Sequence, residues 1–407
     1  MRQLLVMLLF LPAVAFGALT FDSNHQKEMA VLRTFDIDPA FLKDPILNRM
    51  KEQKSAQYHR QRFFGAMDDA YLFIPLIKQI MSESNLPGEF LFLAMAESNF
   101  STKAYSKKSA SGLWQFMTET GRLYGLKIDD YVDERRDLVK STRAAVRYLS
   151  YLHDRFGKWY LAAIAYNCGE GRLARAIQKA GSDELSVLLD KKKCYIPRES
   201  RYYIRKIVAL ALLGTDESYL IDREYDHLLN RANAYSLATV KLARGEKLSR
   251  VAKLLDMPLG DIQQFNRHLK HDFTPPYADT YEVYIPYVKL SEFRQKYKPE
   301  PLQRIYLVHT VQAGDNLSKL GKRYGISYQS IVDFNNLRSN MLSLKQQLVI
   351  PVPKNYTPAE EKRYTVKAGD TLGTIAEQFR VTVRQIKRIN HLDSNTIRIG
   401  EKLSLHD

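Results

Sequence analysis

The 407-residue sequence has only two cysteines, Cys168 and Cys194. At most one disulfide can therefore form, and in an oxidising compartment these two residues could bridge. In the alternative interpretation, each cysteine is a small buried residue. The nine histidines show no HExxH or HxH spacing, so neither a metal site nor a cofactor is expected.

Long apolar runs are also missing. The apolar run at residues 4–16 is shorter than the ~20 residues that a membrane-spanning helix needs. It follows a short basic start and ends near the small residues Ala15 and Gly17, which is typical of a secretory signal peptide. We therefore expect residues 1–17 to be cleaved and the chain to be exported to the periplasm or cell envelope. No cysteine lies near the end of this segment to carry a lipid, so membrane association would be peripheral.

Acidic residues are in the minority, and the formal net charge is +16. A basic surface attracts polyanions. The basic residues are scattered without one long block, however, and an exported protein first meets the acidic polymers of the envelope, so nucleic acid is not expected as a partner. The hydrophobic content of 45% is ordinary for a globular protein, and the length allows two or more domains. We expect a monomer.

The stretch at residues 86–117 carries the strongest chemical signal. A proline near the first turn and a dense apolar run predict a helix. One face of this helix carries Phe90, Leu93, Ala94 and Glu97. A carboxylate on an apolar face loses water, which raises its pKa and lets it donate a proton near neutral pH. In the alternative interpretation, Glu97 bends outward at the helix end, where glutamates are common.

Glu97 is the first of four motifs that occur in a fixed order. Glu97-Ser98 is followed by GLWQFM at residues 112–117, by AYN at residues 165–167 with two nearby glycines, and by ESRYYI at residues 199–204. This series resembles the catalytic domain of the lytic transglycosylases related to goose-type lysozyme, most closely the membrane-bound murein transglycosylase D group. The resemblance covers roughly residues 74–213, where helical periods dominate, and implies an all-α, lysozyme-like catalytic domain.

The resemblance also implies an activity. In these enzymes one glutamate acts first as acid and then as base, and the 6-hydroxyl of the muramic acid attacks, so that the MurNAc–GlcNAc β-1,4 bond of peptidoglycan is cut with a 1,6-anhydro end and without water or metal. Glu97 would be that residue. The resemblance implies further sugar contacts from Ser106, Gly112, Gln115, Tyr166, Asn167 and Tyr203. For Tyr166 the alternative is core packing, and for Gly112 it is simple turn geometry.

A second carboxylate, which acid–base cleavage of a sugar bond usually requires, is not evident. The candidates lie in a polar segment that we interpret as a loop with helix caps, and they are Asp129, Asp130, Asp133, Glu134 and Asp137. We expect Ser141 or Thr142 to cap the helix that follows, and Gly157 to end it. The missing partner agrees with the resemblance, in which one glutamate acts as both acid and base. Two alternatives stay open: a lysozyme-like hydrolase that uses water, and a non-catalytic wall-binding protein.

The C-terminal part contains an internal repeat. TVQAGDNL at residues 310–317 matches TVKAGDTL at residues 365–372, and the same offset of 55 relates Asn335 to Asn390. Each copy is predicted to form a strand, two helices and a strand. This pattern resembles the LysM module, which binds glycans that contain N-acetylglucosamine. The resemblance implies glycan contacts in the loop after the first strand, at Gly314, Asp315, Gly369 and Asp370; the alternative is that the glycine turns the chain and the aspartate caps a helix.

A weaker third copy precedes these two. Gly245 and Asn266 lie 69 residues before Gly314 and Asn335, but the tip of the loop differs. We expect the fold there without sugar binding. The predicted domain order is a signal peptide at residues 1–17, a leader packed on the first domain at 18–70, the catalytic domain at 71–218, a degenerate LysM-like module at 234–288, a LysM module at 307–353, a linker at 354–363 and a LysM module at 364–406.

Overall fold

The computed structural model describes residues 25–58, 73–215, 237–299 and 304–405, apart from residues 355, 357–362, 380 and 391. The predicted signal peptide lies outside the described residues. None of the described helices combines the length and the apolar character that crossing a bilayer requires.

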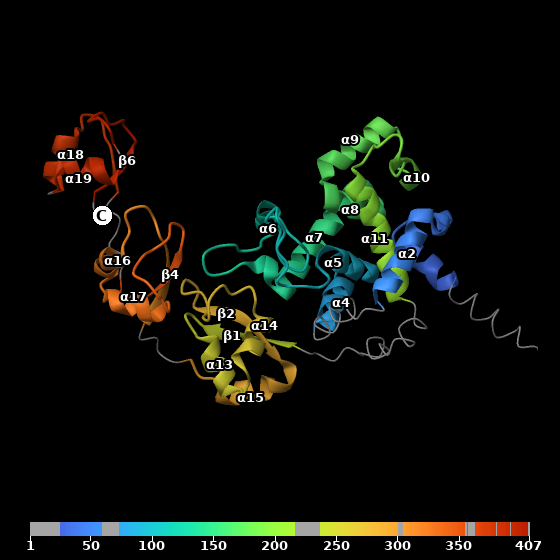
Figure 1. Ribbon diagram of the computed structural model, residues 1–407, viewed down its shortest axis with the longest axis horizontal. Coiled ribbons are helices and arrows are strands. Elements are labelled where there is room, and N and C mark those ends of the chain that lie inside the picture. Colours follow the sequence, from blue (N-terminus) through green and yellow to red (C-terminus); the bar gives the residue numbers. More distant parts are fainter. Residues whose placement is uncertain are drawn as a thin grey trace, which may run out of the picture. The chain divides into compact units, whose positions relative to one another are not determined.

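The first part of the chain is helical, as predicted (Figure 1). Its short 3₁₀ turns are η1 (Pro39–Lys43), η2 (Gly88–Phe90) and η3 (Glu134–Arg136). Its α-helices are α2 (Pro45–Tyr58), α4 (Ile74–Glu83), α5 (Leu91–Ser98), α6 (Thr118–Leu123), α7 (Leu138–Phe156), α8 (Trp159–Cys168), α9 (Glu170–Ala180), α10 (Leu185–Leu188) and α11 (Arg198–Gly214).

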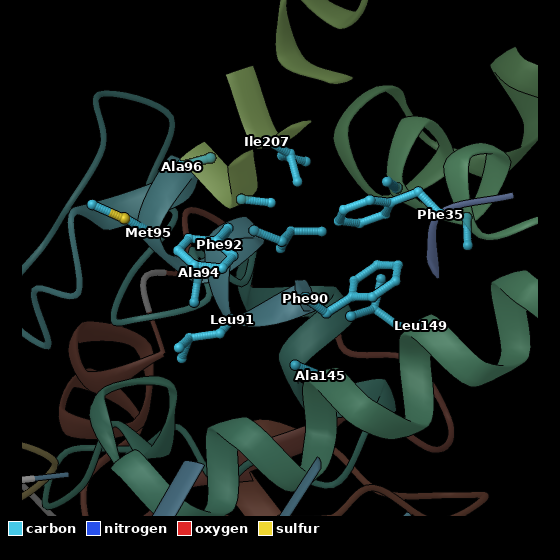
Figure 2. Close-up of a cluster of buried hydrophobic side chains, with 14 of the residues drawn as sticks. Phe35, Phe90, Leu91, Phe92, Ala94, Met95, Ala96, Ala145, Leu149 and Ile207 are labelled. Carbon is cyan, nitrogen blue, oxygen red and sulfur yellow. The ribbon is translucent and has the colours of Figure 1, made fainter. Parts of the chain in front are cut away.

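The short helix α5 lies in the centre of this domain. Residues 91–96 are all buried, and the helix packs against α11. Just before it, Phe90 meets Phe35 with ring centroids 5.4 Å apart, and Figure 2 shows both side chains in one buried cluster with Leu149. A ring pair of this kind contributes about 0.5–1.5 kcal/mol beyond the area it buries. The core therefore fixes α5 in place up to its last turn.

The described part of the leader packs on the helical domain, as expected. Helix α2 lies against α11, and the Arg205 guanidinium donates to Asp44 across 2.7 Å. Phe35, from the same N-terminal segment, is buried, and its carbonyl accepts the Tyr160 N–H. The leader is thus part of the domain's core.

The start of α7 differs from the prediction. The helix begins at Leu138, and the Asp137 carboxylate caps it by accepting the Lys140 N–H at 2.8 Å. Thr142, one of the two predicted caps, lies inside the helix, and its hydroxyl donates to the Leu138 carbonyl. The predicted end is confirmed, because Gly157 adopts a left-handed φ of 74° there.

The LysM-like module contains the predicted strand, two helices and strand. They are β1 (Leu237–Ala243), α13 (Leu248–Leu254), α14 (Leu259–Phe265) and β2 (Thr280–Pro286), and the two strands form one sheet. A further helical segment follows β2, with η5 (Tyr287–Lys289) leading into α15 (Leu290–Lys296). The sequence pattern did not predict this addition.

The two repeat copies have the predicted topology (Figure 1). The first contains β3 (Arg304–Thr310), α16 (Leu317–Tyr324), α17 (Tyr328–Phe334) and β4 (Gln347–Pro353); the second contains β5 (Arg363–Thr365), α18 (Leu372–Gln378), α19 (Val383–Ile389) and β6 (Lys402–Ser404). In each copy the strands pair antiparallel, with His309 opposite Leu348 and Tyr364 opposite Leu403.

One asparagine recurs in each module and makes the same hydrogen bonds there. The Asn335 amide donates to the carbonyls of Ile331 and Val349 and accepts the Val349 N–H, so it ties the second helix to the last strand. Asn390 makes the equivalent three bonds in the second copy. Asn266 does the same in the LysM-like module, where it bonds Tyr284 of β2. Because buried backbone groups need partners, this position requires an amide side chain.

Candidate active site

Glu97 lies in the last turn of α5. The helix stops at Asn99, which adopts a left-handed φ of 50° while its N–H bonds the Met95 carbonyl. Six buried residues precede Glu97 in the helix, and its own side chain is half-buried. The carboxyl group therefore sits at the boundary between the core and solvent, as the helical spacing predicted.

A tyrosine from another helix holds this carboxyl group. The Tyr203 hydroxyl, on α11, donates to Glu97 Oε1. Burial raises the pKa of Glu97 to about 7, and it outweighs the Tyr203 hydrogen bond and the positive charge of Lys206, which both lower the pKa. Burial and the Glu97 charge hold the pKa of Tyr203 well above its usual value, so the phenol keeps its proton and acts as a donor.

Two charged residues on α11 act on the same group. The Lys206 ammonium donates to the Ala96 carbonyl, next to Glu97, and burial lowers the pKa of this lysine. The negative charge of Glu199 raises the pKa of Glu97. Neither residue was predicted as a site residue from the sequence. Their spacing was a usable signal, because Glu199, Tyr203 and Lys206 lie at i, i+4 and i+7 and so share one helix face.

Tyr166 lies beside Glu97 but bonds elsewhere. Its hydroxyl donates to the Trp114 carbonyl at 2.7 Å, and its ring packs against Tyr148 with centroids 5.2 Å apart. Burial and the neighbouring Glu97 charge raise the pKa of Tyr166 well above its usual value. Tyr166 therefore packs in an aromatic cluster and is also close to the candidate acid. These are the two environments that the sequence left open for it.

Gln115 and Gly112 shape the loop that follows α5. The Gln115 amide donates to the carbonyls of Ala104 and Gly112, at 3.2 and 2.8 Å. Gly112 has a φ of 80°, and a Cβ at this position would lie 1.8 Å from the Arg135 carbonyl oxygen. The contact that requires glycine is therefore with η3, because no larger residue fits against that carbonyl.

The remaining polar candidates hold local structure. Asn167 accepts the Ser200 hydroxyl at 2.7 Å, which joins the end of α8 to α11. Ser106 accepts the Ala110 N–H at 3.0 Å within the loop. The Ser98 hydroxyl donates to the Leu113 carbonyl at 2.8 Å, which fixes the loop to the helix end that carries Glu97.

The acidic segment before α7 forms loops and caps, as predicted. Asp129 accepts the N–H groups of Tyr131 and Val132. Asp133 accepts the Arg135 N–H at the start of η3, and Asp137 caps α7. Both cysteines are free thiols in the described chain, with Cys168 half-buried and Cys194 exposed, so no disulfide joins them.

In the two LysM modules, the proposed contact loops are tight turns. Asp315 accepts the His309 imidazole and the Gln312 N–H, both at 2.8 Å. Asp370 accepts the Tyr364 hydroxyl and the Lys367 N–H, both at 2.7 Å. The preceding glycines, Gly314 and Gly369, have φ values of 88° and 89°. The aspartates do not cap the following helices, because the side chains that do so are Asn316 and Thr371.

Family models match most of these regions. A Transglycosylase SLT domain matches residues 75–188, a Lytic transglycosylase MltD, LysM-like domain matches residues 236–301, and LysM domains match residues 309–351 and 364–405. The SLT match contains the end of α5, the loop with Gln115 and the AYN motif.

Individual proteins are similar over different lengths. Membrane-bound lytic murein transglycosylase D of Escherichia coli (strain K12) is 28% identical over 382 residues, which cover 89% of this chain and 82% of that protein. An autolysin of Enterococcus faecalis is 27% identical over 104 residues, or 24% of this chain and 14% of that protein. The solved structure of the 70 kDa soluble lytic transglycosylase of Escherichia coli is 21% identical over 44% of this chain and 32% of that chain, with a TM-score of 0.32. From the ordered domain matches and the relative that spans nearly the whole chain, the protein is identified as a lytic transglycosylase of the membrane-bound murein transglycosylase D type, with LysM domains at its C-terminal end.

Proposed function

We propose that this lytic transglycosylase cleaves the MurNAc–GlcNAc β-1,4 bond of peptidoglycan with Glu97 as its catalytic acid and base. The observation that carries the assignment is the carboxyl group itself: it is half-buried, held by the Tyr203 hydroxyl, and has a pKa raised to about 7. An acid of this strength is partly protonated at neutral pH, which suits it to both halves of a proton-transfer cycle.

The proposed reaction uses the one carboxyl group twice, first as an acid and then as a base. Glu97 gives its proton to the glycosidic oxygen while the C1–O4 bond breaks, and the sugar ring takes up positive charge. The resulting carboxylate then accepts the proton of the muramic acid 6-hydroxyl, and that oxygen bonds C1. One C–O bond breaks and one forms, Glu97 ends protonated, and no water is consumed.

The contacts of Glu97 fit both steps. Tyr203 and Lys206 stabilise the carboxylate that exists after the first proton transfer, because a hydrogen bond and a positive charge favour the ionised form. Burial favours the protonated form that starts the cycle. These opposing influences leave the pKa of about 7 between the ordinary value of 4.5 and that of a fully desolvated acid.

The binding roles are proposed on the resemblance and on position. Ser106, Gly112 and Gln115 lie on the loop that follows α5, and Tyr166 and Asn167 lie in the last turn of α8. We assign these five residues to the sugar-binding groove. In the LysM modules, we assign the glycan contacts to the turns at Gly314-Asp315 and Gly369-Asp370, whose bonded aspartates fix the backbone. The signal peptide at residues 1–17 and the domain limits given above are part of the same proposal. We further propose that the enzyme is a monomer of the periplasm, where its LysM modules meet peptidoglycan.

Mass spectrometry of the released muropeptides tests the reaction. A lytic transglycosylase yields anhydro ends, which are lighter by one water than the reducing ends that a hydrolase yields. We expect anhydro ends from the full chain. Reducing ends would instead support the lysozyme-like alternative, with Glu199 as the carboxylate to examine because its charge reaches Glu97. Absence of any product would support the wall-binding alternative.

A further inference from the structure

The LysM-like module is joined to the catalytic domain by backbone hydrogen bonds. The N–H of Asp133 donates to the His268 carbonyl at 2.8 Å, and the N–H of Lys270 donates to the Tyr131 carbonyl at 2.9 Å. Between these bonds, Val132 forms an antiparallel bridge with the module. The loop before α7 and the loop after α14 therefore meet as two short extended segments.

A buried polar contact reinforces this junction. The Tyr284 hydroxyl, on β2, donates to Asp137 Oδ1 at 2.8 Å. Asp137 is fully buried, Tyr284 is 1% exposed, and the same carboxylate caps α7. Removing one partner from a buried bond of this kind is costly, because the other is left without a partner. The module is thus fixed against the catalytic domain at the start of α7.

A cavity of about 290 Å³ lies at this junction. Its lining comes from both domains and is strongly basic. Besides three residues with apolar or amide side chains, Leu248, Gln263 and Leu269, and the structural Asn266, the cavity is lined by Lys103, Arg136, Arg267, Lys270, His271 and Asp272. Burial lowers the pKa of His271, so this imidazole is mainly neutral at neutral pH. Four cations and one carboxylate remain, which gives the cavity a positive potential.

Three of these cations have no salt-bridge partner in the described part of the chain. Lys103 is exposed, Arg136 donates to the Ser111 hydroxyl at 3.1 Å, and the Lys270 ammonium donates to the Asp129 carbonyl. These neutral partners leave the positive charges uncompensated. The one carboxylate, Asp272, has a buried oxygen without a hydrogen-bond partner, and burial raises its pKa. The cavity thus offers several donors for an anion and one acceptor for an amine.

The cavity adjoins the loop of the candidate active site. Lys103 precedes Ala104, whose carbonyl accepts the Gln115 amide and the Gly112 N–H. Ser111, which Arg136 contacts, directly precedes Gly112. One loop therefore carries residues of the proposed sugar-binding groove and residues that line or support the basic cavity. A sugar bound along this loop would therefore lie beside residues that line the cavity.

We propose that this cavity is a binding subsite for the peptide stem attached to the glycan, with Lys103, Arg136 and Lys270 binding its carboxylates and Asp272 its amine. The proposal rests on the proposed function, since it takes a peptidoglycan strand as the substrate. A volume of 290 Å³ would hold on the order of ten waters, which is more than a single lactyl carboxyl group fills. A short peptide with both charges matches the size and the donor set.

The test compares binding of two kinds of soluble glycan strand to the full chain carrying Glu97→Gln, which keeps strands intact. One strand bears peptide stems. The other has lost its stems to an amidase and keeps only the lactyl carboxylates. Lys103→Glu reverses one charge in the cavity, and Lys107→Glu is the matched control, because Lys107 is an exposed lysine of the same loop that does not line the cavity. Affinities are measured by isothermal titration calorimetry.

We expect Lys103→Glu to weaken binding of stem-bearing strands by about tenfold, the effect of losing one charged hydrogen bond, while Lys107→Glu and the stem-free strands show little change. An equal loss of affinity for both kinds of strand would show that Lys103 binds the lactyl group, and it would overturn the proposal. The proposal would also be overturned if the two lysine variants lowered the affinity equally, or if Lys103→Glu left it unchanged. Cleavage of strands by the Glu97→Gln chain, detected in the same samples, would instead contradict the proposed function. The ratio of the affinities for stem-bearing and stem-free strands would still report on the subsite.

Discussion

The Glu97 carboxyl group is tuned by neighbours from two helices. Its own helix, α5, supplies the burial that raises the pKa, while Tyr203 and Lys206 of α11 oppose that rise. The apolar spacing around Glu97 was enough to predict a raised pKa from the sequence. The size of the shift was not predictable, because it depends on α11, which begins a hundred residues further along the chain.

Glu97 should make the stability of the protein depend on pH. Its folded-state pKa of about 7 lies above the ordinary value of 4.5, so the folded state binds its proton more tightly than the unfolded chain. The protonated group contributes stability that is fully present below about pH 4.5 and is lost as the pH rises through 7. Glu97→Gln cannot titrate. We expect its melting temperature to exceed that of the parent by a margin that grows between pH 5 and pH 8, measured by calorimetry.

The exposed Glu83, at the end of α4, provides a control for that measurement. Glu83→Gln should leave the difference from the parent constant over the same pH range. Parallel curves for Glu97→Gln and the parent would contradict the raised pKa.

Lys206 and Glu199 should move the pH–rate profile in opposite directions. Catalysis needs protonated Glu97, so the activity should fall on the basic side near the pKa of about 7. Lys206→Met removes a positive charge and should move this limb to higher pH. Glu199→Gln removes a negative charge and should move it to lower pH. Initial rates on soluble glycan strands between pH 5 and pH 9 measure both shifts; shifts in one direction, or none, would exclude Glu97 as the titrating group.

At the scale of elements, the loop between α5 and α6 depends on one close backbone contact. Gly112 meets the Arg135 carbonyl of η3, and this contact places the turn that presents Gln115. The sequence indicated that a glycine in this motif has a special role. The sequence did not indicate that Gly112 contacts η3, because η3 lies in a polar segment without a pattern that predicts packing against the loop.

Gly112→Ala should therefore be strongly destabilising. The added Cβ would lie 1.8 Å from a backbone oxygen, and the φ of 80° is unfavourable for alanine. We expect a loss of about 3 kcal/mol or more in the free energy of unfolding, measured in urea. Gly88→Ala is the control, since a Cβ there meets nothing within 4 Å. Similar stabilities of the two variants would show that the loop can move away from η3 at little cost.

The cap of α7 shows why an element's start is hard to predict. Ser141 and Thr142 have the side chains of helix caps, but both are buried inside α7. Thr142 instead accepts the Trp114 indole N–H at 3.0 Å, which ties the helix to the active-site loop. Tertiary packing thus gives the Thr142 hydroxyl another partner, and the helix begins after Asp137 instead. The glycine at the other end was predictable, because the left-handed position that ends a helix is a local requirement.

At the scale of the whole molecule, the repeat was the most informative part of the sequence. Its constant offset showed that the two LysM modules share one topology. The structure explains why the asparagine recurs, because its side chain makes three hydrogen bonds that join the second helix of each module to the last strand. The junction of the LysM-like module with the catalytic domain was not predictable. It depends on backbone bonds between loops and on Tyr284, which no periodic pattern marks.

Removal of the two LysM modules should separate targeting from chemistry. Deleting residues 306–407 should lower the fraction of protein that pellets with insoluble peptidoglycan. We expect the apparent affinity for peptidoglycan to fall by about tenfold or more, because linked weak sites act together. Cleavage of soluble strands should be unchanged. Deleting only residues 363–407 leaves one module and should give an intermediate affinity. Equal pelleting of all three chains would remove the targeting role.

The most direct measurement of the central claim compares cell-wall clearance by Glu97→Gln and by the parent. The substitution keeps the size of the side chain and its bond to Tyr203 while removing the acid. We predict that the clearance rate falls by on the order of 100- to 10,000-fold, while Glu83→Gln clears walls as fast as the parent. A Glu97→Gln chain that clears cell walls at the parental rate would contradict the assignment of Glu97 as the catalytic residue.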